Sequence, residues 1–369
     1  MILSSISLKN VRSHTKTEVN FANNLNYIVG ENGIGKTTIL EAIYYLCTTK
    51  SCVTASDAEV VKFGHDGFEI FGKISGLTND DIQIKYSVSE NKKTILLGNK
   101  QVNRFSDIIG KFPIVMLSPA DHTLTQGHSA DRRKFVDSVI SQASRTYLNL
   151  IIEYNRIIKQ RTSLLIRLKE SPNNKDELRA WNEKLLQTGI EIIKHRKTFV
   201  EEFVVYMKNS YDRILKDKEN PGISYYFLDG YYGEMFENYF ANLLEERQEE
   251  EIARSRNLVG PHKDDFIFEI NNIKLKNFGS QGQHKTFQTI LKFAEYFYLK
   301  DKAGNKPLFL LDDVFGELDA IRAASISNYL GLVGQAFITL TDFGNLSFLK
   351  SDASDKLIRL TINGEVLYE

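Results

Sequence analysis

The stretch Gly30-Glu31-Asn32-Gly33-Ile34-Gly35-Lys36-Thr37 decides the fold of this chain. It fits the pattern G-x-x-x-x-G-K-[ST], follows an apolar segment typical of a strand, and opens a segment with the apolar spacing of a helix. In such a loop the backbone N–H groups surround a phosphate, and the positive end of the helix lies behind them. We therefore predict a nucleotide site in which Lys36 reaches the β- and γ-phosphates and the hydroxyl of Thr37 coordinates magnesium.

A second motif supplies the carboxylate that a magnesium nucleotide needs. The four apolar residues Leu308–Leu311 predict a buried strand of a parallel sheet, and Asp312 and Asp313 follow it directly. Open α/β sheets bind ligands at this edge, beyond the carboxyl ends of the strands. We expect Asp312 to hold the magnesium and Asp313 to orient or deprotonate the attacking water. A pair of helix-capping residues beyond a core strand is the structural alternative.

A third motif, Phe278–Lys285, comes shortly before the acidic pair and opens a predicted helix at residues 283–300. Ser280 is a favourable N-cap residue, Gly282 lets the backbone approach a phosphate, and a helix N-terminus attracts anions. Taken alone, the pattern favours a plain capped helix. Because the chain has one glycine-rich phosphate loop and one such element, the second element could instead serve a nucleotide bound by another molecule.

The order of the predicted elements indicates a helical insertion within an α/β domain. Alternating apolar residues predict strands up to about residue 118, whereas helical spacing predicts long helices at 130–143, 146–169 and 176–215. Asp312 lies 276 positions after Lys36, which is too far for a compact GTPase or small-molecule kinase. We predict an α/β lobe formed by residues 1–118 and 301–369, with a mainly helical lobe formed by residues 119–300.

Composition places the chain among ordinary globular proteins. Its 369 residues include 47 Lys plus Arg and 47 Asp plus Glu, so the formal charge is zero, and 42% of the residues are hydrophobic. These values argue against a polycationic protein and against a disordered chain. No apolar run approaches the roughly 18 residues that span a bilayer, so we expect a cytoplasmic protein without a membrane partner.

The three motifs together resemble the RecF family, one of the ABC-type ATPase heads of chromosome-maintenance and repair proteins. The resemblance runs over essentially the whole chain, and it includes the segments Leu8–Arg12, Gly127–Asp137, Gly260–Asp265, Phe278–Lys285 and Gly316–Asp319. It implies an α/β fold, namely a P-loop ABC-type ATPase head with a mixed sheet and flanking helices, plus the inserted helical lobe. It also implies ATP and Mg²⁺ as cofactors.

The same resemblance implies partners and a mode of action. A protein of this family would form an ATP-dependent homodimer, bind DNA at double-strand/single-strand junctions or gaps, and promote recombinase loading with the mediators RecO and RecR. Hydrolysis of ATP would be weak and would act as a switch. Asp313 stands where ABC transporters carry Glu, and the shorter side chain is consistent with slow hydrolysis.

Roles for individual residues also follow from the resemblance. Residues Gly30–Thr37, together with Thr38 and Arg12, would bind ATP, and Lys36 and Asp313 would be catalytic. Ser280, Gly282 and Gln283 would contact the γ-phosphate of the nucleotide held by the other subunit. Asp319 would face its own symmetry mate at the dimer contact.

Contacts with DNA must come from local charge, because the net charge is zero. Residues 145–169 contain six basic residues against the single acid Glu153. We predict that four of these, Arg145, Arg156, Lys159 and Arg161, form a stripe that follows DNA phosphates without reading sequence. A solvated helix face, offset by the acidic run Glu245–Glu251, is an equally weighted alternative.

Other proteins share parts of this pattern. A transporter ATPase would carry a switch His, but Thr339 to Asp342 stand here, at the end of the buried strand predicted at residues 336–340. A DNA-binding head of the Rad50/condensin class would carry a much longer coiled coil than these helices, which reach only about 60 Å. A metabolite kinase would keep its nucleotide within one chain, so only the ABC-type reading predicts dimers that depend on ATP. A DNA clamp without hydrolysis also remains open.

Overall fold

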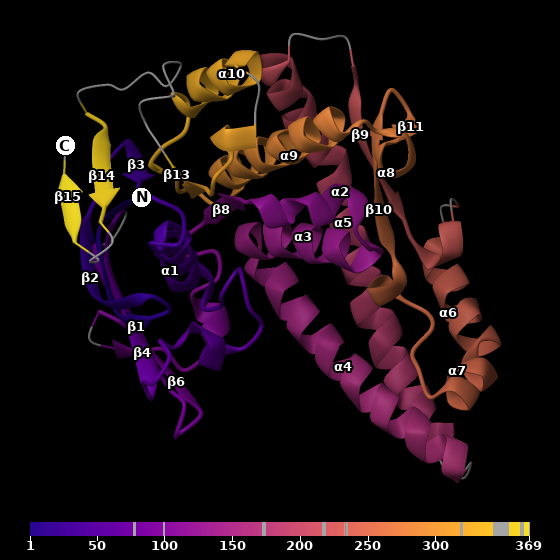
Figure 1. Cartoon of the computed structure of the whole chain (residues 1–369). Coiled ribbons are helices and arrows are strands. Elements are labelled where there is room, and N and C mark those ends of the chain that lie inside the picture. The colour runs from indigo at the N-terminus through magenta and orange to yellow at the C-terminus, as the bar shows by residue number, and fades with distance from the viewer. Residues whose placement is uncertain are drawn as a thin grey trace. The chain divides into compact units, whose positions relative to one another are not determined.

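The computed structural model describes residues 1–76, 79–98, 100–171, 175–215, 219–231, 233, 235–317, 320–341, 354–361 and 365–368. Contacts between residues divide the chain into two compact units. The first unit comprises Met1–Asp121, Asn209–Asp217 and Gln288–Glu369, and the second comprises His122–Lys208 and Lys218–Phe287. Both combine helices with strands (Figure 1).

This division differs in three places from the lobes expected from the sequence. Residues 119–121, 209–217 and 288–300 belong to the first unit, whereas the sequence places them in the helical lobe. For residues 288–300 the reason is the packing of the second half of helix α9 (Gln281–Lys302). Its Phe293 and Tyr296 rings pack on Phe309 of the buried strand β12 (Leu308–Leu311), with ring centroids 5.0 and 5.6 Å apart.

A largely parallel sheet forms the centre of the first unit. Its strand order is β15-β14-β3-β13-β12-β8, and only β15 runs antiparallel to its neighbour. The central strands are buried along their whole length, which explains their uninterrupted apolar sequences. The strands not yet bounded are β3 (Leu25–Val29), β8 (Ile114–Leu117), β13 (Ala336–Leu340), β14 (Lys356–Leu360) and β15 (Val366–Tyr368).

Because β3 and β12 are parallel with β13 between them, their carboxyl ends lie at one edge of the sheet. The glycine-rich loop leaves β3 at this edge and leads into helix α1 (Lys36–Thr48). Asp312 and Asp313 leave β12 at the same edge. The topology therefore brings together two motifs that are far apart in the sequence.

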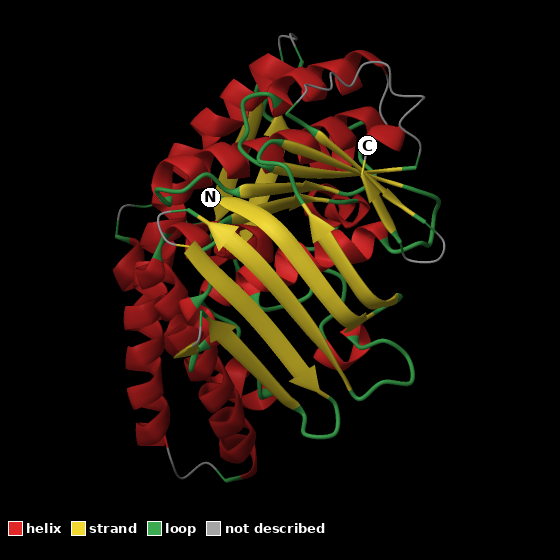
Figure 2. Ribbon diagram, turned by 90° about the vertical axis from the view of Figure 1, so that its left-hand side faces the viewer, coloured by secondary structure: helices red, strands yellow, loops and turns green. Residues whose placement is uncertain are grey.

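An antiparallel sheet packs against helix α1 with one face, and Figure 2 shows its broad open face. The strand order is β2-β1-β4-β5-β6-β7, and alternate residues are buried against α1. Ile6, Ile70 and Ile84 of the sheet share one hydrophobic core with Ile39 and Ile43 of α1. The strand bounds are Ile2–Val11, His14–Asn20, Gly67–Ser75, Asn79–Ser87, Lys92–Leu97 and Lys100–Gln101 for β1, β2 and β4 to β7.

Long helices dominate the second unit, as the periodicity predicted. Ser144 caps α4 (Arg145–Glu170) by accepting a hydrogen bond from the backbone N–H of Tyr147 at 3.2 Å. Leu164, Leu165 and Leu168 of α4 form a core cluster with Leu178 of α5 (Lys175–Ile214). This cluster packs α5 on the preceding helix α4, and the two run side by side in Figure 1.

The remaining elements are short. The second unit contains a small sheet in the order β11-β10-β9, formed by Ile273–Lys274, Asp265–Ile270 and Pro221–Tyr226. Its other helices are α2 (His122–Gln126), α3 (Ser129–Ala143), α6 (Phe236–Glu246), α7 (Gln248–Arg254) and α8 (Leu275–Phe278), while α10 (Ala320–Leu330) belongs to the first unit. Single 3-10 turns lie at Asp57–Val60, Phe105–Asp107, Pro119–Asp121, Leu228–Gly230, Pro261–Lys263 and Phe315–Glu317.

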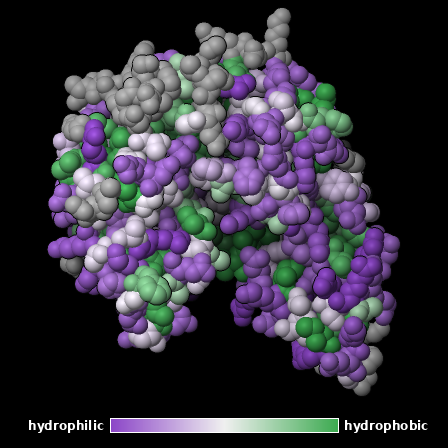
Figure 3. All heavy atoms as spheres, viewed as in Figure 1, coloured by the Kyte–Doolittle hydropathy of each residue, from purple (hydrophilic) through white to green (hydrophobic). Residues whose placement is uncertain are grey.

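The surface carries mostly polar side chains. On the face shown in Figure 3, hydrophobic side chains are scattered among hydrophilic ones. Within the described ranges, every helix is too short or too polar to cross a membrane.

Candidate nucleotide site

The glycine-rich loop has the backbone conformation that its sequence demands. Gly33 and Gly35 have φ angles of 83° and 100°, in the left-handed region where a side chain would be strained. Gly35 directly precedes α1, and among the described residues no side chain caps this helix N-terminus. The first N–H groups of α1, which have no partners within the helix, therefore face the loop and make it a place for an anion.

Lys36 is held inside the loop. Its side chain is buried, and its ammonium group donates hydrogen bonds to the carbonyl oxygens of Gly30 and Glu31 at 2.6 and 2.8 Å. Burial lowers the pKa of Lys36, while the nearby carboxylates of Asp313 and Asp312 act in the opposite direction. The predicted phosphate ligand and the predicted acidic pair are thus electrostatic neighbours.

Asp312 and Thr37, the two residues predicted to bind magnesium, are in direct contact. The Thr37 hydroxyl donates to Oδ1 of Asp312 at 2.9 Å, across 275 positions of sequence. The hydroxyl of Thr339, at the end of β13, donates to the same oxygen at 2.8 Å. Burial raises the pKa of Asp312, and the two hydroxyl hydrogen bonds counter that shift.

Asp313 is turned away from its neighbour by its backbone. Its φ angle of 49° lies in the left-handed region, which Asp adopts more readily than most residues. Its N–H donates to the Thr339 hydroxyl at 2.9 Å, which holds this turn. Consequently Asp312 is buried while Asp313 is exposed, and the two adjacent carboxylates can have different roles.

Arg12, predicted to bind ATP, is paired with Glu41 of α1. Its Nε and Nη2 donate to the carboxylate of Glu41 at 3.0 and 2.9 Å, and 28% of its side chain remains exposed. Guanidinium has five N–H donors, so this pairing leaves donors that a nucleotide could use. The Ser51 hydroxyl also contacts Glu41, which fixes the carboxylate from the other side.

The structure adds two residues that sequence reasoning missed. Thr339 bridges Asp312 and Asp313, and His14 contacts the carbonyl of Gly35. Thr339 had a usable signal, because it comes at the carboxyl end of a predicted buried strand. His14 belongs to no sequence motif, and only the tertiary structure brings it into contact with the loop at Gly35.

The turn at the start of α9 lies in the second unit. Ser280 and Gln283 form a reciprocal cap: the N–H of Gln283 donates to the Ser280 hydroxyl at 3.2 Å, and the N–H of Ser280 donates to Oε1 of Gln283 at 2.9 Å. Ser280 is exposed, and the side chain of Gln283 also donates to Glu219 at 2.9 Å. The local cap therefore exists, and the Ser280 hydroxyl proton stays available to another acceptor. Asp319 lies outside the described residues.

The expected DNA stripe needs one correction. Arg145, Arg156 and Lys159 are exposed on α4, but Arg161 is completely buried and cannot reach DNA in this structure. Its guanidinium pairs with Glu251 at 2.7 Å and donates to Asn182 at 2.9 Å. Glu251 is also fully buried, so it neutralises Arg161 rather than belonging to a solvated acidic run.

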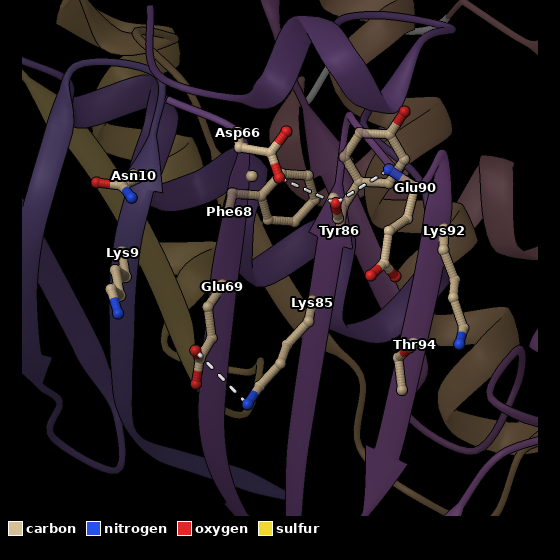
Figure 4. A pocket seen from close by; sticks show the side chains of 12 residues that line it. Lys9, Asn10, Asp66, Phe68, Glu69, Lys85, Tyr86, Glu90, Lys92 and Thr94 are labelled. Carbon is tan, nitrogen blue, oxygen red and sulfur yellow. Dashed lines mark hydrogen bonds and ion pairs between the residues drawn. The ribbon is translucent and has the colours of Figure 1, made fainter. Parts of the chain in front are cut away.

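A hollow of about 400 Å³ lies elsewhere, on the open face of the antiparallel sheet (Figure 4). The described residues lining it include Lys9, Lys85 and Lys92 as well as Asp66, Glu69 and Glu90. The two signs of charge balance, and Lys85 and Glu69 pair at 3.8 Å. Since this balance selects neither an anion nor a cation, we assign the hollow no ligand.

Comparison with known proteins identifies relatives that belong to one family. Residues 2–361 match the family model described as the RecF/RecN/SMC N terminal domain. The DNA replication and repair protein RecF of Chloroherpeton thalassium is 38% identical, covering 93% of this chain and 95% of the relative. RecF of Flavobacterium johnsoniae is 37% identical, covering 92% and 94%.

Solved structures agree with the sequence comparisons. The recombination mediator protein RecF with ATP, from the RecFOR pathway, superposes with a TM-score of 0.89 at 30% identity, covering 100% of this chain and 97% of that one. The Smc head domain of Pyrococcus furiosus superposes with a TM-score of 0.58 at 14% identity, which indicates a shared fold alone. The expected ATPase-head fold is thus confirmed.

Proposed function

This chain belongs to the RecF family of DNA replication and repair proteins, and on that premise we propose that it is an ATP-dependent DNA-binding protein of recombinational repair. One observation carries the nucleotide part of the proposal: the phosphate loop and the acid at the end of β12 meet through Thr37 and Asp312. The solved relative with ATP has the same fold.

The loop and the acidic pair have different roles at the nucleotide. Residues Gly30–Thr38 and Arg12 bind the ATP, with Lys36 on the β- and γ-phosphates. Thr37 and Asp312 fit a magnesium site, because two hard oxygens within 2.9 Å of each other are the kind of ligands that Mg²⁺ combines with water and phosphate. Such an ion would neutralise phosphate charge. Exposed Asp313 orients the water for slow hydrolysis.

The α9 turn completes the nucleotide site of a second copy of the chain. The Ser280 hydroxyl accepts a hydrogen bond from the N–H of Gln283, so its own proton can still be donated to a phosphate oxygen. Gly282 permits close approach of the backbone, and Gln283 stabilises the turn. ATP then becomes part of the homodimer interface, with Asp319 at the symmetry contact, and hydrolysis removes the bonds between subunits.

The DNA surface includes the exposed basic face of α4. The exposed basic residues on this face are Arg145, Arg156 and Lys159. Arg156 and Lys159 are three positions apart, so they lie on the same side of the helix. The preferred substrate is a gap or a junction of double and single strands, RecO and RecR are the partners, and the protein acts in the cytoplasm. The proposed DNA substrate, partners and location rest on the membership of this chain in the RecF family.

The α4 surface is testable by removing two charges. The double variant Arg156→Ala/Lys159→Ala should bind duplex DNA about tenfold more weakly, and the slope of log affinity against log salt should fall by about 2. The control is Arg179→Ala/Lys184→Ala, which removes the same charge from exposed positions on α5. Binding by fluorescence anisotropy across a salt series measures both. Equal effects of the two double variants would reject α4 as the DNA surface.

The function as a whole is tested with duplex, single-stranded and gapped DNA, each with and without ATP and magnesium. We expect tightest binding to gapped DNA with ATP present. Equal affinity for all three DNAs and indifference to nucleotide would contradict the proposal.

A further inference from the structure

We propose that His14 is a positioning residue of the nucleotide site, which aims the backbone N–H of Lys36 at the phosphate by holding the carbonyl of Gly35 from behind. This inference rests on the proposed ATP binding and adds a residue that does not itself touch the nucleotide.

His14 contacts the phosphate loop through one nitrogen and its own strand through the other. It is the first residue of β2 and is 4% exposed. Its Nε2 lies 3.1 Å from the carbonyl oxygen of Gly35, and its Nδ1 lies 2.9 Å from the hydroxyl of Thr17. A carbonyl only accepts hydrogen bonds, so Nε2 must carry the proton and the Thr17 hydroxyl must donate to Nδ1. The carbonyl of Gly35 thereby selects the tautomer, and the Thr17 hydroxyl, which can donate or accept, matches it.

Holding this carbonyl fixes the neighbouring N–H group. In a trans peptide the C=O of Gly35 and the N–H of Lys36 point in opposite directions within one plane. A carbonyl directed at His14 therefore directs the Lys36 N–H away from His14. Among the described residues, a second hydrogen bond to this oxygen comes from the N–H of Ile39 at 3.3 Å, which is long for such a bond. His14 supplies the shorter contact to the oxygen.

The sequence at position 35 is adapted to this contact. A Cβ built on Gly35 would lie 2.4 Å from Nε2 of His14 and 2.7 Å from Oγ of Ser13. Only glycine lets the imidazole lie directly against the loop backbone. Arg12, two residues before His14, pairs with Glu41, so this part of the chain contacts α1 at one point and the loop before it at another.

The environment favours the neutral imidazole. Burial lowers the pKa of His14, the positive charge of Lys62 lowers it further, and the hydrogen bond to Gly35 opposes both. A neutral ring has one donor and one acceptor, which is the pair of roles that the two contacts require.

Replacing His14 by Gln or by Asn distinguishes a positioning role from a packing role. The side-chain nitrogen of Gln can occupy the place of Nε2, whereas that of Asn corresponds to Nδ1 and does not reach Gly35. We expect His14→Gln to bind ATP within about twofold of the unaltered protein, and His14→Asn to bind about three- to tenfold more weakly, which is the range for one lost hydrogen bond. Titration calorimetry with ATP and magnesium measures this, and thermal unfolding confirms that both variants are folded.

Equal weakening by Gln and Asn, or no weakening by Asn, would overturn the proposal. An independent measurement on the unaltered protein is the ¹⁵N chemical shift pair of the His14 ring. It should show a proton on Nε2, and a proton on Nδ1 would refute the assignment. If the unaltered protein failed to bind ATP, the proposed function would fail, whereas the tautomer would still report on the Gly35 contact.

Discussion

Ser280→Arg is expected to abolish ATP-driven dimers while leaving ATP binding by the monomer intact. Ser280 is exposed at the start of α9, where the proposed partner phosphate must approach closely. An arginine side chain fills that space, so we expect the dimer affinity in ATP and magnesium to fall by more than about 100-fold, a loss of over about 3 kcal/mol. Light scattering coupled to gel filtration measures the dimer, and calorimetry at low protein concentration measures ATP binding.

Ser280→Ala is the matched control for the loss of the helix cap. Both variants lose the acceptor that the Gln283 N–H uses, which costs about 1 kcal/mol of folding stability. Only the arginine adds bulk, so the alanine variant should retain weakened dimers. Unaltered dimers of the arginine variant would remove the α9 turn from the interface.

Lys36→Ala is expected to weaken ATP binding by about 100-fold. The lysine supplies charge-assisted hydrogen bonds to the phosphates, each worth up to about 3 kcal/mol. Its ammonium group donates to the carbonyls of Gly30 and Glu31, which both belong to the loop, so the loss of these local contacts should leave the fold intact.

The control for charge is Lys50→Ala, at an exposed position just after α1. This variant changes the net charge equally and should bind ATP normally. ATP binding by Lys36→Ala close to that of the Lys50→Ala control would show that the loop is not the phosphate site.

Much of the nucleotide site could be predicted because short motifs fix it. The loop pattern specifies its own backbone, and a buried strand followed by acids specifies where that strand ends. Parallel pairing then brings Thr37 and Asp312 within 2.9 Å, a distance that no local pattern encodes but that the topology requires. The long helices were predictable because their apolar spacing persists over many turns.

Other features depend on tertiary partners that the sequence conceals. Arg161 looks like one more surface cation, yet it falls on the buried side of α4 with Ile157 and Leu164, and its counter-ion is 90 positions away. His14 reveals its role only when β2 is folded against the loop. Helices α6, α7 and α10 are too short for periodicity to identify them securely.

The central claim, that each nucleotide is held by two protomers, is tested by mixing the two defective variants. Lys36→Ala retains the Ser280 turn, and Ser280→Arg retains the phosphate loop, so one complete site can form only between the two different chains. With each chain carrying its own fluorophore and with a non-hydrolysable ATP analogue, we predict monomers of either variant alone and energy transfer in the mixture. Dimers of either variant alone, or an absence of energy transfer in the mixture, would contradict the shared site.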